Sequence, residues 1–392
     1  MMADPLSRRA ALRAGLALGA AGGLAGIAEL ASVGGSAAAG RQLRIGYLPI
    51  TDSAPLLIAH AQGRYTQAGL DVARPILFRS WASLAEAFLA AEVDVVHLLM
   101  PFAIQLRYAL GAAVRVIAWN HTNGSALTVA PGLGRIEELA GRQVAIPYWW
   151  SIHNVVSQQM LRTAGLRPVV REQPSAAAGT VQMVVMSPAD MLPALDTGTI
   201  GGYVVADPFN AAAEIKKVGR IARFVGDAWR DHACCVVVVR QELIDRAPEQ
   251  VQGLVDALAA AQLWINTHRQ ATAGLLSSGR YLPQPVAAIT RALTYPAERY
   301  TASGALHHPS WQGQRIGFAP YPFPSYTRRL VEAMRETAVD GDTGFLADID
   351  PETVHRELVD DRFVLRALAG LGGPGAFGLP DSLNRVEEVE PA

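Results

Sequence analysis

Polar residues that could bind a small ligand recur where predicted strands lead into predicted helices. Thr51, Asp52 and Ser53 follow an apolar run, and Asp190 and Asp207 each lie within two residues of a proline that opens a predicted helix. A helix start offers unpaired backbone N–H groups and the positive end of the helix dipole, so several such turns could hold a small anion without Lys or Arg. Each of these residues can also be a helix cap. An Asp that faces the ligand would instead favour an amine or amide donor.

Two further turns carry an indole and an imidazole. Trp81 follows Ser80, and His153 lies at the start of a predicted helix behind Ser151. An indole N–H donates a hydrogen bond while its ring walls a pocket, and an imidazole can bind or titrate. We predict that Trp81 and His153 share one ligand site. The alternative for His153 is an ordinary core or surface side chain.

Cys234 and Cys235 are the two cysteines of the chain, and they are adjacent. Neighbouring cysteines cannot link distant segments, so the fold must depend on packing. We interpret them as small apolar residues opening a buried strand, with a vicinal disulfide or a reactive thiol as the alternative.

The sequence gives no sign of catalysis or of a bound cofactor. The nine histidines are scattered along the chain, so no metal site is predicted. The sequence also lacks a Gly-x-Ser-x-Gly nucleophile motif and a phosphate-binding P-loop. We therefore expect no catalytic residue and no cofactor.

The elements that must position these residues alternate short apolar strands with amphipathic helices, which predicts an α/β fold. In the first unit, strands are expected over 43–48, 70–77, 93–99, 114–119 and 126–129, and helices over 55–67, 83–91 and 103–110. In the second, strands are expected over 143–146, 181–186 and 202–205, and helices over 152–164, 189–196 and 209–218. A strand over 236–239 and a long helix over 248–267 follow.

Two successive α/β units, with the chain returning to the first, predict two lobes. We expect crossings near 125–130 and 235–240. The expected boundaries are a first lobe over 40–127, a second over 128–236, a return to the first over 237–330, and a helical C-terminal extension with a flexible tail over 331–392. Residues 371–392, rich in Gly and Pro and then acidic, are expected at the surface or disordered.

Composition supports a folded protein that does not bind nucleic acid. The 392 residues are 50% hydrophobic and 18% charged, with a net charge of −1. A substantial core is therefore expected. Binding to nucleic acid would need clustered Lys and Arg, which this charge balance does not favour.

The N-terminus has the pattern of an export signal. Arg8 and Arg9 precede an apolar stretch over 14–27, and small residues at 36–39 suit a signal peptidase. We predict a twin-arginine-type signal peptide over 1–39, cleaved after Ala39. A membrane anchor is the alternative, but Glu29 and the many glycines make a poor spanning helix.

Several motifs together resemble one family. The run 46–56, Gly-Tyr-Leu-Pro-Ile-Thr-Asp-Ser-Ala-Pro-Leu, resembles the opening of the nitrate- and bicarbonate-binding proteins of ABC importers, within the nitrate/sulfonate/taurine-binding group. Further matching runs lie at 80–84, 93–101, 123–128, 187–191 and 207–210. The resemblance covers roughly 41–239 and implies the two-lobed, Venus-flytrap fold of type II periplasmic binding proteins.

The resemblance also implies ligand contacts. The family's tryptophan falls on Trp81, its polar hinge residue on Ser125 and its helix-start histidine on His153. Its lysine, which lies beyond a histidine, falls on Cys235, with His232 in the histidine's place. Without that lysine the compensating charge for an anion is lost, which argues against nitrate. The other predicted ligand-site residues are Thr51, Asp52, Asn123, Ser151, Asp190, Asp207 and Asn210.

These features predict a non-enzymatic, extracytoplasmic solute-binding receptor of an ABC importer, located in the periplasm or at the cell surface. It would capture a small polar or anionic molecule of the nitrate, bicarbonate or sulfonate class by hinge closure, and deliver it as a monomer to the importer's permease. One alternative is an enzyme on the same fold, similar to a thiamine-pyrimidine synthase or a dehydratase. Another is a sensor partner that binds a membrane protein but no solute.

Overall fold

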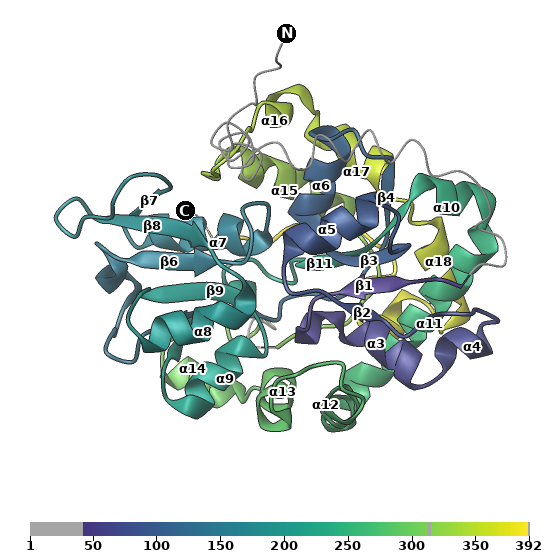
Figure 1. Ribbon diagram of the computed structural model, residues 1–392, viewed down its shortest axis with the longest axis horizontal. Coiled ribbons are helices and arrows are strands. Elements are labelled where there is room, and N and C mark those ends of the chain that lie inside the picture. The colour runs from purple at the N-terminus through teal and green to yellow at the C-terminus, as the bar shows by residue number, and fades with distance from the viewer. Residues whose placement is uncertain (1–41, 312–314, 391–392) are drawn as a thin grey trace, which may run out of the picture.

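The computed structural model describes residues 42–311 and 315–390. The predicted signal peptide and its cleavage position lie outside these residues. The strands form two separate sheets, each covered by helices, so the chain has two lobes (Figure 1).

The first sheet has the strand order β2-β1-β3-β11-β4. Its strands are β1 (Ile45–Tyr47), β2 (Ile76–Leu77), β3 (Val95–Leu99), β4 (Val114–Trp119) and β11 (Cys235–Arg240). Strand β11 lies between β3 and β4 and runs antiparallel to both, while β1 is parallel to β2 and β3. The start of β11 therefore lies at the same end of the sheet as the carboxyl ends of β3 and β4.

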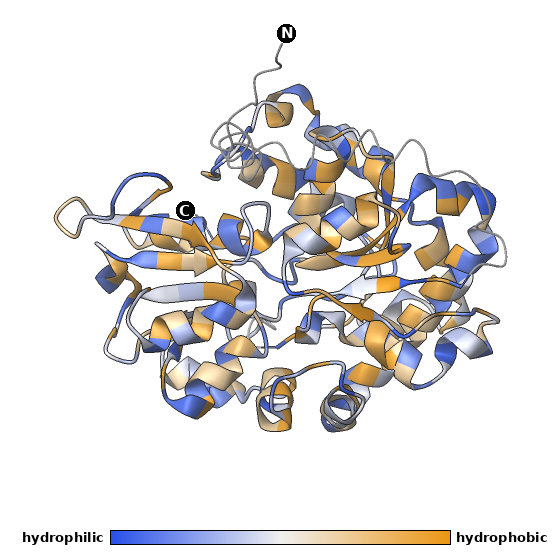
Figure 2. Cartoon of the chain, in the orientation of Figure 1, coloured by the Kyte–Doolittle hydropathy of each residue, from blue (hydrophilic) through white to orange (hydrophobic). Residues whose placement is uncertain are grey.

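The second sheet has the strand order β10-β5-β9-β6-β8-β7. Its strands are β5 (Ser125–Val129), β6 (Gln143–Ile146), β7 (Arg167–Val169), β8 (Thr180–Val185), β9 (Gly202–Ala206) and β10 (Arg220–Phe224). Strands β5 and β9 are buried throughout, and Figure 2 shows hydrophobic residues gathered on the strands of both sheets. Burial of these apolar faces supplies most of the driving force for each lobe.

Helices surround each sheet. Those nearest the first sheet are α3 (Ala54–Ala61), α4 (Arg64–Gln67), α5 (Trp81–Leu89), α6 (Met100–Tyr108), α10 (Gln241–Arg246), α11 (Pro248–Thr267), α12 (Arg269–Ser278) and α18 (Arg362–Gly370). Those of the second lobe are α7 (Ile152–Thr163), α8 (Pro188–Asp196), α9 (Phe209–Lys216), α13 (Val286–Leu293) and α14 (Ala297–Ala302). The C-terminal region adds α15 (Pro324–Arg335), α16 (Phe345–Asp348) and α17 (Pro351–Leu358). Short 3-10 turns cover Thr51–Ser53, Ile136–Leu139, Val225–Asp227 and Pro374–Phe377.

Most predicted elements match the structure closely. The strands Val114–Trp119 and Gln143–Ile146 and the helix Pro248–Thr267 agree residue for residue. The strand expected over 70–77 is only Ile76–Leu77, because Pro75 cannot donate to a ladder.

The predicted crossings were wrong by a few residues. The segments 125–129 and 235–240 are strands β5 and β11, and the links between the lobes precede them. The long apolar runs favour strands over linkers. The region 237–330 also reaches both lobes, since α13 and α14 pack in one apolar cluster with residues of α9.

The two links lie side by side at the hinge. Thr122 forms a β-bridge with Ala233, and the Asn123 N–H donates to the His232 carbonyl at 3.0 Å. A third segment joins them, since Thr122 and Gly317 exchange backbone hydrogen bonds of 2.8 and 2.9 Å. These backbone pairings keep the two links in register.

Residues 371–390, the described part of the C-terminal tail, lie at the surface, which was one of the two expectations for this segment. Trp229, within the second link, forms a β-bridge with Val389 and donates its indole N–H to Glu387 at 3.0 Å. Arg223 pairs with Glu390 at 3.1 Å. The tail is therefore attached to the hinge by charge-assisted contacts.

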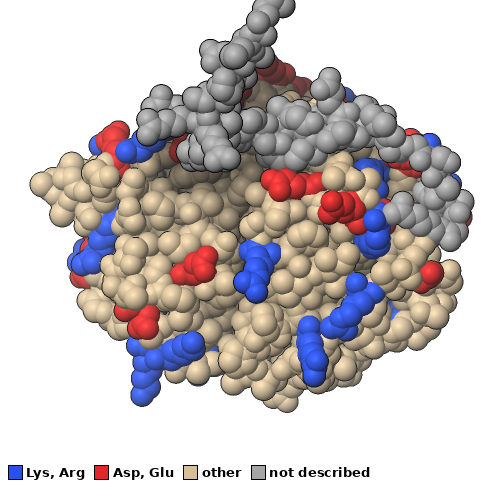
Figure 3. Space-filling model, viewed as in Figure 1, with Lys and Arg blue, Asp and Glu red and all other residues tan. Residues whose placement is uncertain are grey.

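Within the described residues, no helix is both long and apolar enough to cross a membrane. On the face seen in Figure 3, the described Lys, Arg, Asp and Glu residues are dispersed over several elements.

Asp94, the residue before β3, connects two partly buried arginines at the end of the first sheet opposite the hinge, which gives a test of the fold. It accepts from Arg44 at 3.0 Å and from Arg240 at 3.1 Å. We expect Asp94→Asn to lower the free energy of unfolding at pH 7 by about 2 kcal/mol, because it leaves two cations uncompensated. Urea denaturation measures the loss, and the exposed Asp196→Asn is the control, with an effect within about 0.5 kcal/mol.

The loss should also depend on pH. Burial raises the pKa of Asp94, but the hydrogen bonds and charge of Arg44, with the charge of Arg240, lower it further, so the net shift is downward. The carboxylate therefore stabilises the fold above the unfolded-chain pKa of about 4, and this contribution disappears as the pH falls through the lowered value. Equal urea midpoints for Asp94→Asn and Asp196→Asn at pH 7 would contradict this account.

Candidate functional site

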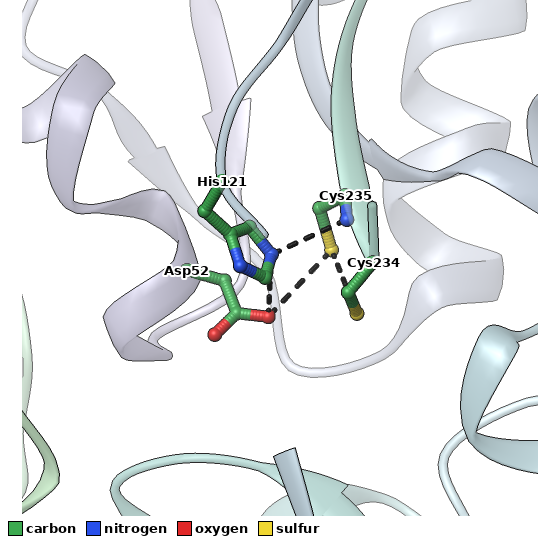
Figure 4. Close-up of side chains that lie close together, drawn as sticks. All are labelled: Asp52, His121, Cys234 and Cys235. Carbon is green, nitrogen blue, oxygen red and sulfur yellow. Dashed lines mark hydrogen bonds and ion pairs between the residues drawn. The ribbon is translucent and has the colours of Figure 1, made fainter. Parts of the chain in front are cut away.

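Four side chains converge beside the hinge, at the end of the first sheet where β3 and β4 terminate. Asp52, His121, Cys234 and Cys235 each offer a ligand atom, and these atoms all lie within 4.8 Å of one another (Figure 4). All four residues are buried, and both thiols are free. This group is called the hinge cluster below.

The topology of the first sheet positions the hinge cluster. Cys235 opens β11 opposite Leu99, the last residue of β3. His121 lies two residues after the end of β4, and Asp52 lies in the 3-10 turn that follows β1. Because β11 is antiparallel to its neighbours, residues 52, 121 and 234–235 reach one edge from distant parts of the sequence.

The cluster is held by short polar contacts. His121 Nε2 lies 2.8 Å from Asp52 Oδ2 and 3.2 Å from the backbone nitrogen of Cys235. The two sulfurs are 3.6 Å apart, and Cys235 Sγ lies 3.9 Å from Asp52 Oδ2.

Burial and mutual charge shift the acidity of these groups. Burial raises the pKa of Asp52 to about 6, although His121 opposes that rise. Burial lowers the pKa of His121, but the Asp52 carboxylate outweighs it and raises the value to about 10. The two groups therefore form a buried ion pair at neutral pH.

The two thiols shift in opposite directions. Burial raises the pKa of Cys234, but a hydrogen bond from Cys235 and the nearby imidazoles of His153 and His121 hold it well below the ordinary value. Burial and the adjacent Cys234 raise the pKa of Cys235 well above its ordinary value. Of the two thiols, Cys234 therefore has the lower pKa.

The hinge cluster contacts the second lobe through His153. Its Nε2 lies 3.8 Å from Cys234 Sγ and 3.0 Å from the hydroxyl of Ser125. On the other side, the His97 ring lies 6.4 Å from the His121 ring and 5.7 Å from the Trp81 ring. Trp81 and His153, predicted to share a site, thus lie in one buried region.

Several buried polar atoms in this region lack a hydrogen-bond partner among the described residues. They are Asp52 Oδ1, Trp81 Nε1, His97 Nδ1 and Nε2, His121 Nδ1 and His153 Nδ1. An unpaired buried polar atom costs about 1–3 kcal/mol, so a cluster of them is rarely kept without a function. The region is therefore the best candidate for a ligand site.

Thr51 and Asp207 join the two lobes. The Thr51 backbone N–H and its hydroxyl both donate to the Asp207 carbonyl, at 2.8 and 3.0 Å. The Asp207 carboxylate accepts from the Tyr295 hydroxyl at 2.9 Å, and burial raises its pKa to about 7.

Other predicted site residues already have partners elsewhere. Ser151 caps α7 by accepting from the Asn154 N–H at 3.1 Å. Asn210 accepts from Thr128 at 2.8 Å within the second lobe, and Asn123 donates to Asp231 at 3.0 Å.

The structure does not bring Asp190 into the buried region. This residue is exposed on the first turn of α8, whose buried residues are Pro188, Met191 and Leu195. Its position in the first helical turn favours the helix dipole, and its side chain faces solvent, outside the buried region.

Sequence reasoning missed His97, His121 and Cys234. It rejected a metal site because the histidines are scattered along the chain, but the fold gathers them around β11. The order of strands in the sheet could have indicated these residues. Because β11 lies antiparallel between β3 and β4, its first residues lie at the carboxyl ends of those two strands, where ligand sites form in α/β sheets.

Similarities to known protein families and structures agree with the fold. A family model described as the NMT1-like family matches residues 36–277, more than half of the chain. The crystal structure of the periplasmic nitrate-binding protein NrtA from Synechocystis is similar with a TM-score of 0.73 and 19% sequence identity, covering 88% of this chain and 92% of that one.

Curated relatives match at low identity. The nitrate/nitrite binding protein NrtA of a Nostoc species is 24% identical over 242 residues, covering 56% of this chain and 53% of the relative. The taurine-binding periplasmic protein of Escherichia coli is 26% identical over 214 residues, covering 54% and 63%. The chain thus spans between about half and two thirds of the length of these two relatives. The predicted resemblance to this group is confirmed, and the chain belongs to the NMT1-like family, with the two-lobed fold of periplasmic binding proteins.

Proposed function

We propose that this chain is a solute-binding receptor of an ABC importer, which captures a small polar solute by closing its two lobes. The observation that carries the proposal is the set of unpartnered buried polar atoms that both lobes present at the hinge. Trp81, His97 and His121 come from the first lobe and its link, and His153 comes from the second. A solute bound there would satisfy these atoms and connect the lobes.

The contacts between the lobes support hinge closure. The hydrogen bonds from Thr51 to the Asp207 carbonyl join the lobes directly, and Trp81 and His153 are buried. A solute can reach this region only when the lobes separate. Hinge closure around a ligand is an established mode of motion for two-lobed binding proteins.

The electrostatics restrict the solute. The residue in place of the family lysine, Cys235, is an uncharged buried thiol, and the cation of the hinge cluster, His121, is paired with Asp52. A bound anion would therefore lack a free compensating charge from the cluster. The names of the nitrate/nitrite-binding and taurine-binding relatives support a small polar solute without fixing its charge.

We further propose that the protein is exported by the twin-arginine route, acts as a monomer outside the cytoplasm, and docks on the importer's permease. The Arg8-Arg9 pair and the apolar stretch after it support export.

A solute screen tests receptor function. We expect at least one solute among nitrate, bicarbonate, taurine, alkanesulfonates and divalent metal ions to raise the melting temperature, since a ligand at one hundred times its Kd adds about 2.7 kcal/mol. If the responding solute is not a metal ion, Trp81→Phe should weaken its binding at least tenfold by removing the indole donor. The control is Trp264→Phe, because Trp264 lies on α11 and stacks on His268, and the affinity of this variant should stay within twofold.

An unchanged melting temperature across the panel would argue against a receptor. Equal losses in Trp81→Phe and Trp264→Phe would argue against this site. Turnover of a solute would support the enzymatic alternative.

Thiol labelling tests the requirement for lobe opening. Cys234 and Cys235 are fully buried, so iodoacetamide should modify them at least tenfold more slowly in the folded protein than in the urea-unfolded chain. Mass spectrometry after timed quenching gives both rates. Modification at equal rates would show that the region is open to solvent and would contradict closure.

Export can be tested with a reporter fused after residue 41. The leader should carry the folded reporter out of the cytoplasm of a bacterium with a twin-arginine translocase. Replacing Arg8 and Arg9 with lysines should reduce export at least tenfold, as measured by cell fractionation. Export unaffected by the replacement would contradict the twin-arginine route.

A further inference from the structure

The hinge cluster has the composition of a metal site. We infer that Asp52, His121, Cys234 and Cys235 bind a thiophilic divalent ion of the Zn²⁺ class. That this ion is the transported solute rests on the proposed function, whereas the site itself depends only on the geometry of the four residues.

The donor set is specific. Two sulfurs, one imidazole nitrogen and one carboxylate oxygen are ligands of zinc and of related borderline-soft ions, whereas Mg²⁺ and Ca²⁺ select oxygen donors. Each donor comes from a buried side chain, so bulk water does not compete with the ion for these ligand atoms.

The spacing of the donors suits four-coordinate binding. Two sulfurs bound to one zinc at about 2.3 Å lie about 3.8 Å apart in a tetrahedron, and the Cys234 and Cys235 sulfurs are 3.6 Å apart. The separation of 3.9 Å between Cys235 Sγ and Asp52 Oδ2 is close to a ligand edge as well. His121 Nε2 and Asp52 Oδ2 are closer, at 2.8 Å, because they form a hydrogen bond. If the ion replaced the proton shared by His121 Nε2 and Asp52 Oδ2, these two atoms would move apart by about 0.5 Å.

Two further atoms of these ligands point to a missing partner. Asp52 Oδ1 and His121 Nδ1 are buried and have no hydrogen-bond partner among the described residues. A purely structural ion pair would be expected to satisfy both. An ion bound through Oδ2 and Nε2 would replace the His121 imidazolium as the charge that compensates the carboxylate.

The position of the cluster connects the ion to the hinge. Asp52 belongs to the first lobe, whereas His121 and Cys234 belong to the two links between the lobes. His153 of the second lobe lies 3.8 Å from Cys234 Sγ. An ion bound here therefore fixes both links against the first lobe and lies beside a side chain of the second.

Binding is a ligand exchange without a redox step. The thiol and imidazolium protons of the ligands pass to solvent as the metal–ligand bonds form, and the ion loses its bound waters. The two sulfurs stay reduced throughout.

The test uses the chain from residue 40 onward, without a histidine tag, reduced and stripped of metal with a chelator. Titration with Zn²⁺ in a calorimeter should give one equivalent with a Kd of 1 μM or tighter, on the order expected for a buried four-donor site. Co²⁺ should give the sulfur-to-cobalt charge-transfer band and intense tetrahedral d–d bands. This spectrum requires no variant, so it is informative even if a variant misfolds.

Variants locate the ion. Cys235→Ser, His121→Gln and Asp52→Asn should each weaken Zn²⁺ binding at least 100-fold, with folding checked by circular dichroism. The matched control is His268→Gln, since His268 is exposed and stacks on Trp264 outside the hinge cluster, and its Kd should stay within twofold. Fewer than 0.1 equivalents bound, a cobalt spectrum without the sulfur band, or a Cys235→Ser variant with unchanged affinity would overturn the site.

Failure of the site and failure of the receptor function give different results. Small-angle scattering of the metal-free and Zn²⁺-loaded chain should show a smaller radius of gyration when the ion is bound. Binding at the cluster without compaction would overturn the role of the ion as solute and leave the site intact. A Trp81-dependent response to another solute, with no Zn²⁺ bound, would overturn the metal site and leave the receptor function intact.

Discussion

The antiparallel placement of β11 between β3 and β4 is the constraint on which the rest of the structure depends. A chain that leaves one sheet, builds a second and returns must enter the first sheet somewhere. Here it enters between β3 and β4, with its first residues at the end of the sheet where those two strands end. Both links between the lobes therefore meet at one place, and their side chains face the residues that follow β1 and β3. The hinge and the candidate site have the same structural origin.

This arrangement buries polar atoms without partners, which destabilises the folded state, and burial of the apolar core must offset that loss. Unpartnered polar atoms of Trp81, His97 and His153 are buried in the same region as a charged pair. Each such atom opposes folding by about 1–3 kcal/mol. The buried strands of both sheets and the backbone pairing of the two links supply the compensation. A fold that retains this cost at its hinge is consistent with selection for binding rather than for stability alone.

Much of the fold could be predicted from the sequence, because strand and helix periodicities depend on local residues. The runs 114–119 and 248–267 carry patterns that need no tertiary context. The candidate site was only partly predictable. Trp81 and His153 could be predicted from their places at helix starts, whereas His97 and His121 carry no local signal. Their proximity depends on the order of strands in the sheet, which a linear pattern does not encode. Asp190 shows the opposite case, since its local signal for a helix start was real but said nothing about which side of the helix faces the hinge.

The attachment of the C-terminal tail has a practical consequence for any work on this protein. Glu387 and Val389 contact Trp229 within the second link, and Glu390 contacts Arg223 near the end of β10. An affinity tag or fluorescent protein fused to the tail would lie next to the hinge. A polyhistidine tag at this position would also compete for transition metals. Fusions are therefore better placed at the other terminus, in the position of the leader, while a small dye at the tail would be well placed to report opening and closing.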